Sequence, residues 1–519
     1  MKTIDLLTLG LPYITYTFLS LVSNSWILFL PKEYIISISV VFAFLQFITL
    51  RYSFQLNMFY FSISIILLWT LGILFFPIQN LNLGDGVILL ETLVLESKIF
   101  GYELILDEVL EGLIHSSFYS IINNKFPNPM FSFRILSTAA GFFLLTLIFW
   151  KNRKNLFPSL VIICSGGSIL FFGYVENYTY VSLFLLLFQI LGISYIQEEK
   201  KSLLGLLILT LVASIAILLH LLSGYLIFSL VYLCYILSAK ENFWRNAFLS
   251  TILGLTILVS FVGYFFLFSE LRFDLSLSHI ANPKFYPMKR MISISHFMEI
   301  FYCLIFSSLP SISIIAYFYF SEKEVWKKVV YSSEGKFILW VLFGLVLHAF
   351  TFNPQLGFPS DWDLMSLYWT SFAMFAFILL KEKTEIFPKL LPVIIFSFII
   401  TVSNVFILNK EDPNKANELN FVLKTIDEFV PKYKTQIEKI HPKDRKFYLK
   451  TSFFLFKSRV ILENQESSSE NNSLKNENYE LEKEFNSNFQ NRTKDWNKNF
   501  LERATKFNIR FIEYSKNLK

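Results

Sequence analysis

The sequence predicts an all-α polytopic membrane protein with about 13 transmembrane helices, amphipathic helices in a long first outer loop and a small helical C-terminal tail. Apolar residues make up 54% of the 519 positions and charged residues only 17%, whereas soluble domains carry about 25% charged residues. Apolar stretches of the roughly 17–25 residues that cross a bilayer recur from residue 6 to residue 408. Lysine and arginine are concentrated in every second loop, which is typical of a chain with a fixed orientation in the membrane.

The apolar stretches give the approximate bounds of the expected spans. They lie near residues 6–30, 34–50, 57–78, 135–150, 156–175, 179–196, 202–222, 224–239, 247–268, 297–320, 337–352, 365–380 and 390–408. Three cysteines fall inside these spans and are interpreted as small apolar residues, without disulfide or metal-binding spacing: Cys164, Cys234 and Cys303.

The charge of the loops predicts the orientation. With Lys2, one side of the membrane carries 16 basic residues, against eight on the other side before the tail. Because cytoplasmic loops are rich in Lys and Arg, we expect a bacterial inner-membrane protein with a cytoplasmic N-terminus and a periplasmic C-terminus. The formal net charge of +6 does not indicate nucleic-acid binding, since 22 of the 46 Lys and Arg follow residue 408.

Residues 1–408 are expected to form a transmembrane domain, with long outer loops at 79–134 and 269–296. Residues 409–519 are expected to form a periplasmic helical tail. Apolar residues recur at helical spacing after residue 419, and a Ser-, Asn- and Glu-rich stretch near 463–480 is typical of a flexible linker.

Acidic residues of the first outer loop are the first candidates for a site. Asp85 stands between two glycines just after a span, where glycine permits a sharp turn and the close approach of a ligand. Glu108 is a second candidate, in a segment whose apolar residues recur at helical spacing, and His115 lies one helical turn beyond Glu111. A plain turn at Asp85 and a solvated helix face at Glu108 are the structural alternatives.

Glu176 lies where the fifth expected span ends and the sixth begins, between Tyr174 and Tyr178. An ionisable residue near membrane depth indicates a functional site, although tyrosine is also common in the headgroup region. His220, with Ser223 and Gly224, ends the seventh span and is a weaker candidate. His348 lies deeper in its span and is interpreted as structural.

The loop 353–363 has two prolines and a glycine, and its last residues are Asp361, Trp362 and Asp363. One of these carboxylates can cap the next helix while the other contacts a ligand. The loop 269–296 carries basic residues outside the membrane, among them Arg272, Lys289 and Arg290. They are suited to a phosphate or to anionic lipid headgroups.

These features resemble the GT-C superfamily of membrane glycosyltransferases, which includes protein O-mannosyltransferases, aminoarabinose transferases and bacterial oligosaccharyltransferases. The resemblance covers the architecture of most of residues 1–408 and Asp85 as the acid of the first long loop. This chain departs from the pattern because the loop follows the third expected span and carries a single Asp, not an acidic pair.

The resemblance implies transfer of a sugar from a polyprenyl-phosphate carrier to an acceptor hydroxyl on a glycan, lipid or protein. Asp85 would be the general base, with Glu108 second, and cations would stabilise the departing phosphate. The substrate-binding residues would be Glu176, Tyr178, His220, Asp361, Asp363, Arg272, Lys289 and Arg290. A divalent metal such as Mg or Mn suits carboxylates, but the sequence indicates no ligand set.

Three other functions remain open. A transporter or flippase would use charged residues within the spans, and the expected spans have almost none in their middles. A polymerase or ligase of surface polysaccharide would rely on a basic late outer loop, as 269–296 is. A non-catalytic scaffold would explain the tail but not the acidic and aromatic clusters.

Overall fold

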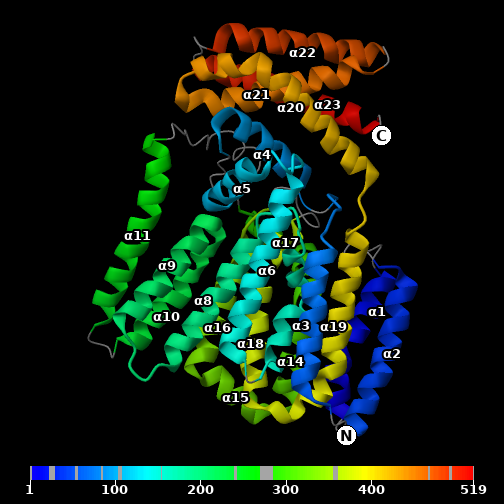
Figure 1. Cartoon of the computed structure of the whole chain (residues 1–519), viewed down its shortest axis with the longest axis vertical. Coiled ribbons are helices and arrows are strands. Elements are labelled where there is room, and N and C mark those ends of the chain that lie inside the picture. The colour runs from blue at the N-terminus through cyan, green and yellow to red at the C-terminus, as the bar shows by residue number, and fades with distance from the viewer. Residues whose placement is uncertain are drawn as a thin grey trace.

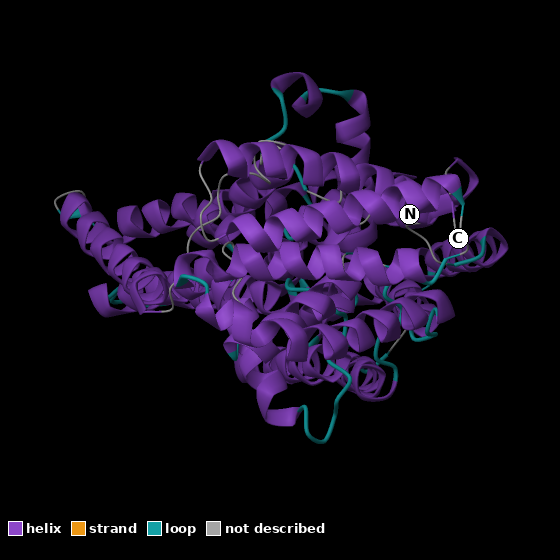
Figure 2. Ribbon diagram, turned by 90° about the horizontal axis from the view of Figure 1, so that it is seen from above, coloured by secondary structure: helices purple, strands orange, loops and turns teal. Residues whose placement is uncertain are grey.

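The computed structural model describes residues 3–22, 30–52, 56–82, 84, 86–102, 108–153, 155–238, 242–268, 285–354, 361–465, 468–489 and 494–517. These residues form helices joined by loops (Figure 2), and their β structure is a single isolated bridge between Phe285 and Phe352. The fold class predicted from the sequence is confirmed for this part of the chain.

Nine helical segments of the described chain are long and apolar enough to cross a membrane. Their helices are α2 (Lys32–Arg51), α3 (Met58–Phe75), α6 (Met130–Asn152), α8 (Thr179–Gln197), α11 (Phe243–Phe268), α14 (Ile294–Ser321), α16 (Ser333–Thr351), α17 (Trp362–Ser366) with α18 (Trp369–Glu382), and α19 (Phe387–Leu408). Shorter apolar helices join the bundle: α1 (Thr3–Val22), α9 (Leu203–Leu219) and α10 (Ile227–Leu237), which follows the 3₁₀ turn η3 (Leu221–Leu226). Each of these elements overlaps a span expected from hydropathy.

The fifth expected span, 156–175, is not one continuous helix. It consists of the 3₁₀ turn η1 (Phe157–Ser159), the short α7 (Leu160–Ile163) and the 3₁₀ segment η2 (Gly166–Phe171), and all of it is buried. Irregular backbone at membrane depth requires polar partners inside the protein. The hydroxyl of Ser137 donates to the carbonyl of Leu170 over 2.8 Å and accepts the N–H of Gly173 over 3.0 Å.

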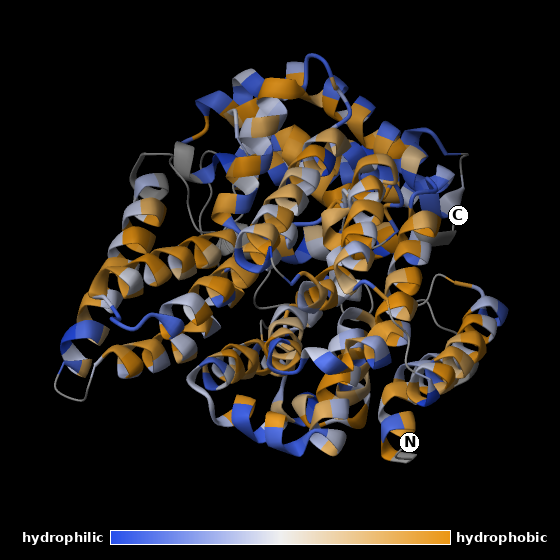
Figure 3. Ribbon diagram, turned by 60° about the horizontal axis from the view of Figure 1, so that its bottom comes forward, coloured by the Kyte–Doolittle hydropathy of each residue, from blue (hydrophilic) through white to orange (hydrophobic). Residues whose placement is uncertain are grey.

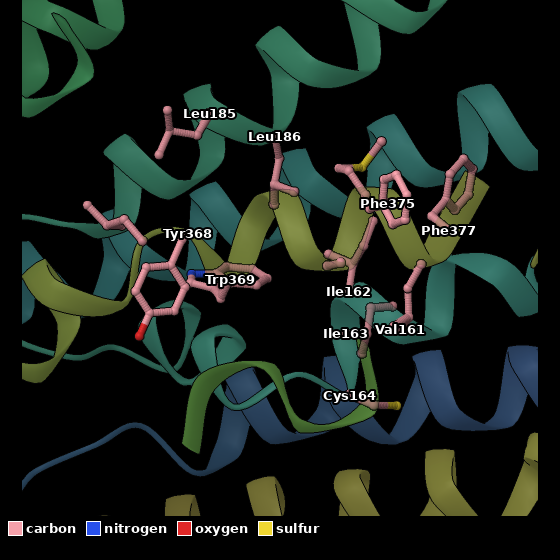
Figure 4. Packing of buried hydrophobic residues seen from close by; sticks show 14 of the residues in the cluster. Val161, Ile162, Ile163, Cys164, Leu185, Leu186, Tyr368, Trp369, Phe375 and Phe377 are labelled. Carbon is pink, nitrogen blue, oxygen red and sulfur yellow. The ribbon is translucent and has the colours of Figure 1, made fainter. Parts of the chain in front are cut away.

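Close packing explains why this crossing is irregular. A side chain at Gly167 would lie 2.4 Å from the Trp369 ring, so only glycine fits against that indole. Figure 4 shows Val161 to Cys164 of this segment, with Tyr368 and Trp369 close by. Hydropathy detects the apolar character of such a segment but not its backbone conformation.

Two helices of the first outer loop lie over one end of the bundle: α4 (Gly86–Phe100) and α5 (Val109–Ile122). Above them lie α20 (Pro413–Lys439), α21 (Pro442–Glu463), α22 (Ser469–Asn488) and α23 (Lys494–Asn517), as Figure 1 shows. Leu90 and Leu93 of α4 share a core with Val422 and Ile426 of α20.

The expected linker near 463–480 is instead largely helix α22. Its Leu474, Leu481 and Phe485 are buried against the other tail helices, and these three apolar positions stabilise a helix in an otherwise polar stretch. Figure 3 shows hydrophobic residues along the bundle helices, with hydrophilic residues concentrated in the tail and at helix ends.

The remaining short elements lie in loops between the longer helices. They are α13 (Met288–Met291), which precedes α14, then α15 (Lys323–Tyr331), and the 3₁₀ turn η4 (Thr384–Ile386). Helix α15 lies at the end of the bundle away from the tail (Figure 1).

Candidate functional site

The polar clusters of the sequence meet at the end of the bundle covered by α4 and α5. Glu108 is the N-cap residue of α5, and Asn177 and Tyr178 precede α8. His220 joins α9 to η3. All four side chains are buried, so helices that are distant in sequence bring them into one water-poor region.

Two side chains lie close to the Glu108 carboxylate. The Nδ2 of Asn177 donates to its Oε2 over 2.5 Å, and the Nε2 of His220 lies 3.3 Å from its Oε1. The Nδ1 of His220 accepts the backbone N–H of Leu222 over 3.1 Å. A neutral imidazole whose Nδ1 is an acceptor carries its proton on Nε2, so the N–H of His220 lies on the side of the carboxylate. Glu108 is therefore held in a fixed orientation and does not lie on a solvated helix face.

Tyr178 is a buried phenol that four acidic groups influence. Burial raises its pKa well above the ordinary value of 10.0, and the carboxylates of Glu108, Asp363, Glu176 and Asp361 raise it further, in that order. Its ring lies 5.4 Å from that of His220. The phenol is neutral in this field, and four carboxylates from three separate parts of the chain act on it together.

The loop before α4 packs against Glu176. Gly84 has a φ of +63°, and a Cβ built on it would lie 1.7 Å from Oε1 of Glu176 and 3.3 Å from the hydroxyl of Tyr174. Glycine is therefore required at position 84 both by conformation and by space. Asp85 itself lies outside the described residues, and its neighbour Gly86 packs against Val175.

Asp361 and Asp363 flank the start of α17. Asp361 is the N-cap residue, but its side chain accepts no capping hydrogen bond from the helix. Asp363 is buried, and its Oδ1 accepts the N–H of Leu364 over 2.9 Å. Between them, Trp362 packs edge-on against Phe306, with centroids 4.8 Å apart, and lies 6.2 Å from the ring of Tyr174. This packing fixes the short helix at the site.

The basic loop reaches the site through its last residues. The N–H of Tyr286 donates to the carbonyl of Thr351 over 3.0 Å, which ties this strand-like segment to the end of α16. Burial and Glu299 raise the pKa of Tyr286, Arg290 lowers it, and Asp361 raises it. Tyr286 therefore lies in the electrostatic field of both the basic loop and the acidic cluster.

Arg290 is paired within this loop. Its Nη2 donates to Oε1 of Glu299 over 2.6 Å and its Nη1 to Ser295 over 2.5 Å. His296 lies between Glu299, 3.3 Å from its Nδ1, and the carbonyl of Phe350, 3.1 Å from its Nε2. Lys289 is exposed. The third basic candidate, Arg272, lies outside the described residues.

Sequence reasoning assigned no functional role to several polar residues of this region, although it noted the spacing of Glu111 and His115 and interpreted His348 as structural. Glu111 is fully buried on α5, and its Oε1 lies 3.2 Å from Nε2 of His115, which stacks on Phe133. Their spacing of four residues was the available signal. Glu299 and His296, three residues apart at the start of α14, had the same kind of signal. His348 packs against Tyr225 and Phe352 in α16.

Among the described residues, no group of three or more His, Cys, Asp or Glu side chains has the geometry of a metal site. The four carboxylates around Tyr178 are hydrogen-bond acceptors and negative charges. They are suited to sugar hydroxyls and to the acceptance of a proton.

No family model matches this chain, and no curated protein matches it. Among solved structures, the crystal structure of ArnT from Cupriavidus metallidurans in the apo state is similar, with a TM-score of 0.43 and 10% sequence identity. The match covers 87% of this chain and 74% of that one. Fold and site together define a polytopic all-α membrane protein with a buried acidic site at one end of its bundle.

Proposed function

We propose that this chain is a GT-C-type membrane glycosyltransferase of a bacterial inner membrane. It would move a sugar from a polyprenyl-phosphate carrier to a hydroxyl of a glycan, lipid or protein acceptor on the periplasmic side. The observation that carries the proposal is the buried polar cluster of Glu108, Asn177, Tyr178 and His220, at the end of an apolar bundle covered by two outer-loop helices. A donor with a prenyl tail and a polar sugar requires both surroundings at once.

The proposed reaction needs one proton transfer and one displacement. A base takes the proton of the acceptor hydroxyl, whose oxygen attacks the anomeric carbon while the bond from that carbon to the phosphate oxygen breaks. Asp85 is the proposed base. Its flanking glycines pack on Glu176 and Val175, which supports a position beside the acidic cluster.

Glu108 is the second candidate for the base, and its contacts favour a different role. One of its carboxylate oxygens accepts a hydrogen bond from Asn177, and the other lies 3.3 Å from Nε2 of His220, so both oxygens already face protein side chains. In the proposed mechanism it orients sugar or acceptor hydroxyls, together with Glu176, Asp361, Asp363 and the Tyr178 phenol.

The departing phosphate needs positive charge. Arg290, Lys289 and Arg272 are proposed to supply it. The guanidinium of Arg290 has five N–H donors, so it can keep its contact with Glu299 and turn other N–H groups toward the phosphate. Arg290 lies 5.8 Å from the ring centroid of Tyr286, and both Arg290 and Asp361 act on the pKa of that tyrosine, which is consistent with neighbouring phosphate and sugar subsites.

A transporter is the second candidate, and the broken crossing at 157–171 favours it because transporters use discontinuous helices at their substrate sites. The contacts of this crossing argue against a substrate there. Its glycines pack on Trp369 and on the Phe306 carbonyl, and the hydroxyl of Ser168 donates to its own segment, to the carbonyl of Ile163.

The decisive experiment supplies a polyprenyl-phosphate sugar to the purified full chain in nanodiscs and measures release of free polyprenyl phosphate. Asp85→Asn should lower the rate by about 10²–10⁴-fold, the usual contribution of a general base. Glu324→Gln is the matched control, since Glu324 is exposed on α15 at the opposite end of the bundle. Full activity of a correctly inserted Asp85→Asn protein would refute the proposed base. Proton-dependent uptake of substrate without transfer would favour the transporter.

A further inference from the structure

A groove of about 910 Å³ lies between α3 and α6, which are neighbours in Figure 1. Eight of its ten lining residues are apolar residues or threonines of the two helices: Ile63, Ile66, Leu67, Thr70, Phe142, Leu145, Thr146 and Phe149. Trp150 and Arg153 complete the lining. None of these residues belongs to the acidic site.

The groove is apolar despite its two threonines. The hydroxyl of Thr70 donates to the carbonyl of Ile66 over 2.7 Å, and that of Thr146 donates to the carbonyl of Phe142 over 2.9 Å. Both threonines satisfy their hydrogen-bonding groups within their own helices. The two threonine hydroxyls therefore have no free O–H with which to hold water in the groove.

The groove faces the bilayer. Leu67 and Trp150 are 57% and 60% exposed, and both helices have the length and hydropathy of membrane spans. An exposed apolar face of such a helix meets lipid in a membrane. The occupant is therefore a lipid chain.

Length and charge identify the kind of lipid. From Phe142 to Arg153, α6 rises roughly 16 Å at about 1.5 Å per residue, and one leaflet of a bilayer has a hydrocarbon thickness of about 15 Å. Arg153 therefore lies at headgroup level when a chain fills the groove. It is exposed, and the nearby Lys151 ammonium lies 4.2 Å from the centroid of the Trp150 ring, an arrangement typical of the membrane interface.

We propose that the α3–α6 groove binds one anionic phospholipid, with an acyl chain between the helices and its phosphate on Arg153. Helix α6 begins beside Gly173 of the site loop and ends at Asn152. The groove includes Arg153, directly after this end of α6, so its charged end lies opposite the acidic site. This lipid site is separate from any donor site and does not depend on the proposed function.

Native mass spectrometry of the full chain in detergent tests the headgroup contact. The protein is titrated with phosphatidylglycerol and, separately, with phosphatidylcholine of the same acyl chains. The wild-type protein should retain phosphatidylglycerol preferentially, and Arg153→Gln should lower that preference about fivefold, the value of one basic residue near an anionic surface. Arg51→Gln, at an exposed position outside the groove, is the matched control and should keep the wild-type preference.

A second variant tests the groove itself. Thr146→Trp fills the space between the helices and should reduce retention of both lipids, whereas Leu255→Trp, exposed on α11, should not. Equal retention of the two lipids by the wild-type protein, or no effect of Arg153→Gln and Thr146→Trp, would overturn the proposal. Recovery of a polyprenyl phosphate from the groove, identified by its mass and lost in Thr146→Trp, would overturn it as well.

Discussion

The Nε2 of His220 lies 3.3 Å from Oε1 of Glu108, while its Nδ1 accepts the N–H of Leu222. The turn between α9 and η3 thus determines which ring nitrogen carries the proton. Glu108 begins an outer-loop helix, and His220 ends a bundle helix. This contact therefore attaches the outer loop to the bundle at the candidate site.

A double-mutant cycle between these residues should measure the contact. His220→Ala and Glu108→Gln should each destabilise the protein, and their free energies of unfolding should be non-additive by about 0.5–3 kcal/mol, as for residues in direct contact. Chemical unfolding in detergent measures the four free energies. Glu108→Gln combined with Ser202→Ala, a cap at the other end of α9, should be additive. Additivity in the His220 cycle as well would contradict the contact.

Gly84→Ala should reduce activity strongly. The alanine is disfavoured at a φ of +63°, and its Cβ would displace the Glu176 carboxylate. Misplacement of a reacting group by about 1 Å can cost about 10²-fold in rate. Gly86→Ala is the matched control, because its Cβ would contact the movable methyl group of Leu81 at 3.1 Å. The transfer assay compares the two variants, and equal losses would show that the contact between Gly84 and Glu176 has no special role.

Glu111 and His115 predict a stability plateau in pH. Burial, with a smaller contribution from Glu108, raises the pKa of Glu111 well above 4.5, and burial lowers the pKa of His115 from 6.5 to about 3. Below pH 6.5 the unfolded chain gains a proton on His115 that the folded state lacks, so stability falls as the pH decreases toward 3. Above pH 4.5 the folded state keeps a proton on Glu111 that the unfolded chain loses, so stability falls as the pH increases.

Directly above pH 4.5 the two slopes oppose each other, and each is about 1.4 kcal/mol per pH unit for one proton. Thermal unfolding in detergent should therefore show little change of stability with pH just above pH 4.5 in the wild-type protein. Glu111→Gln should make stability rise with pH there, up to pH 6.5, and His115→Asn should remove the decrease below pH 4.5. Identical pH profiles of the wild-type protein and Glu111→Gln would refute the protonated state assigned to Glu111.

The tail should be held on α4 by ion pairs between one buried carboxylate and two partly exposed lysines. Glu96 is 1% exposed, and the Nζ atoms of Lys446 and Lys450 on α21 lie 3.1 and 3.6 Å from its Oε1. Removing both lysines leaves a buried charge without its cations, which costs about 3–5 kcal/mol. Glu96→Gln leaves lysines that water can solvate, so it should cost about 1–2 kcal/mol.

Hydrogen exchange of α4 and α21 measures this difference, with larger deprotection in Lys446→Ala/Lys450→Ala than in Glu96→Gln. Lys475→Ala, on α22, controls for general loss of charge in the tail. The opposite order of the two variants would mean that Glu96 is solvated in the folded protein. Deprotection should extend toward the loop before α4, because the backbone N–H groups of Gln79 and Asn80 both donate to the carbonyl of Leu408.

The sequence alone determined the membrane class, the helical fold and the approximate position of each crossing. Hydropathy depends on the summed transfer free energy of about 20 neighbouring residues, and it therefore detects a span without knowledge of its partners. The same property explains the error at 156–175. An apolar segment has the same hydropathy whether it forms a helix or, as here, an irregular path held by Ser137 and packed against Trp369.

Only the tertiary structure decided which polar residues meet. Glu108, Glu176 and Asp361 were separate candidates in sequence, and each had a structural alternative: a solvated helix face for Glu108, the headgroup region for Glu176 and a helix cap for Asp361. Their common field on Tyr178 arises from the packing of α5, α8 and α17 at one end of the bundle. Side-chain partners such as Asn177 and Glu299 depend on distances across the fold, and no local pattern of residues encodes those distances.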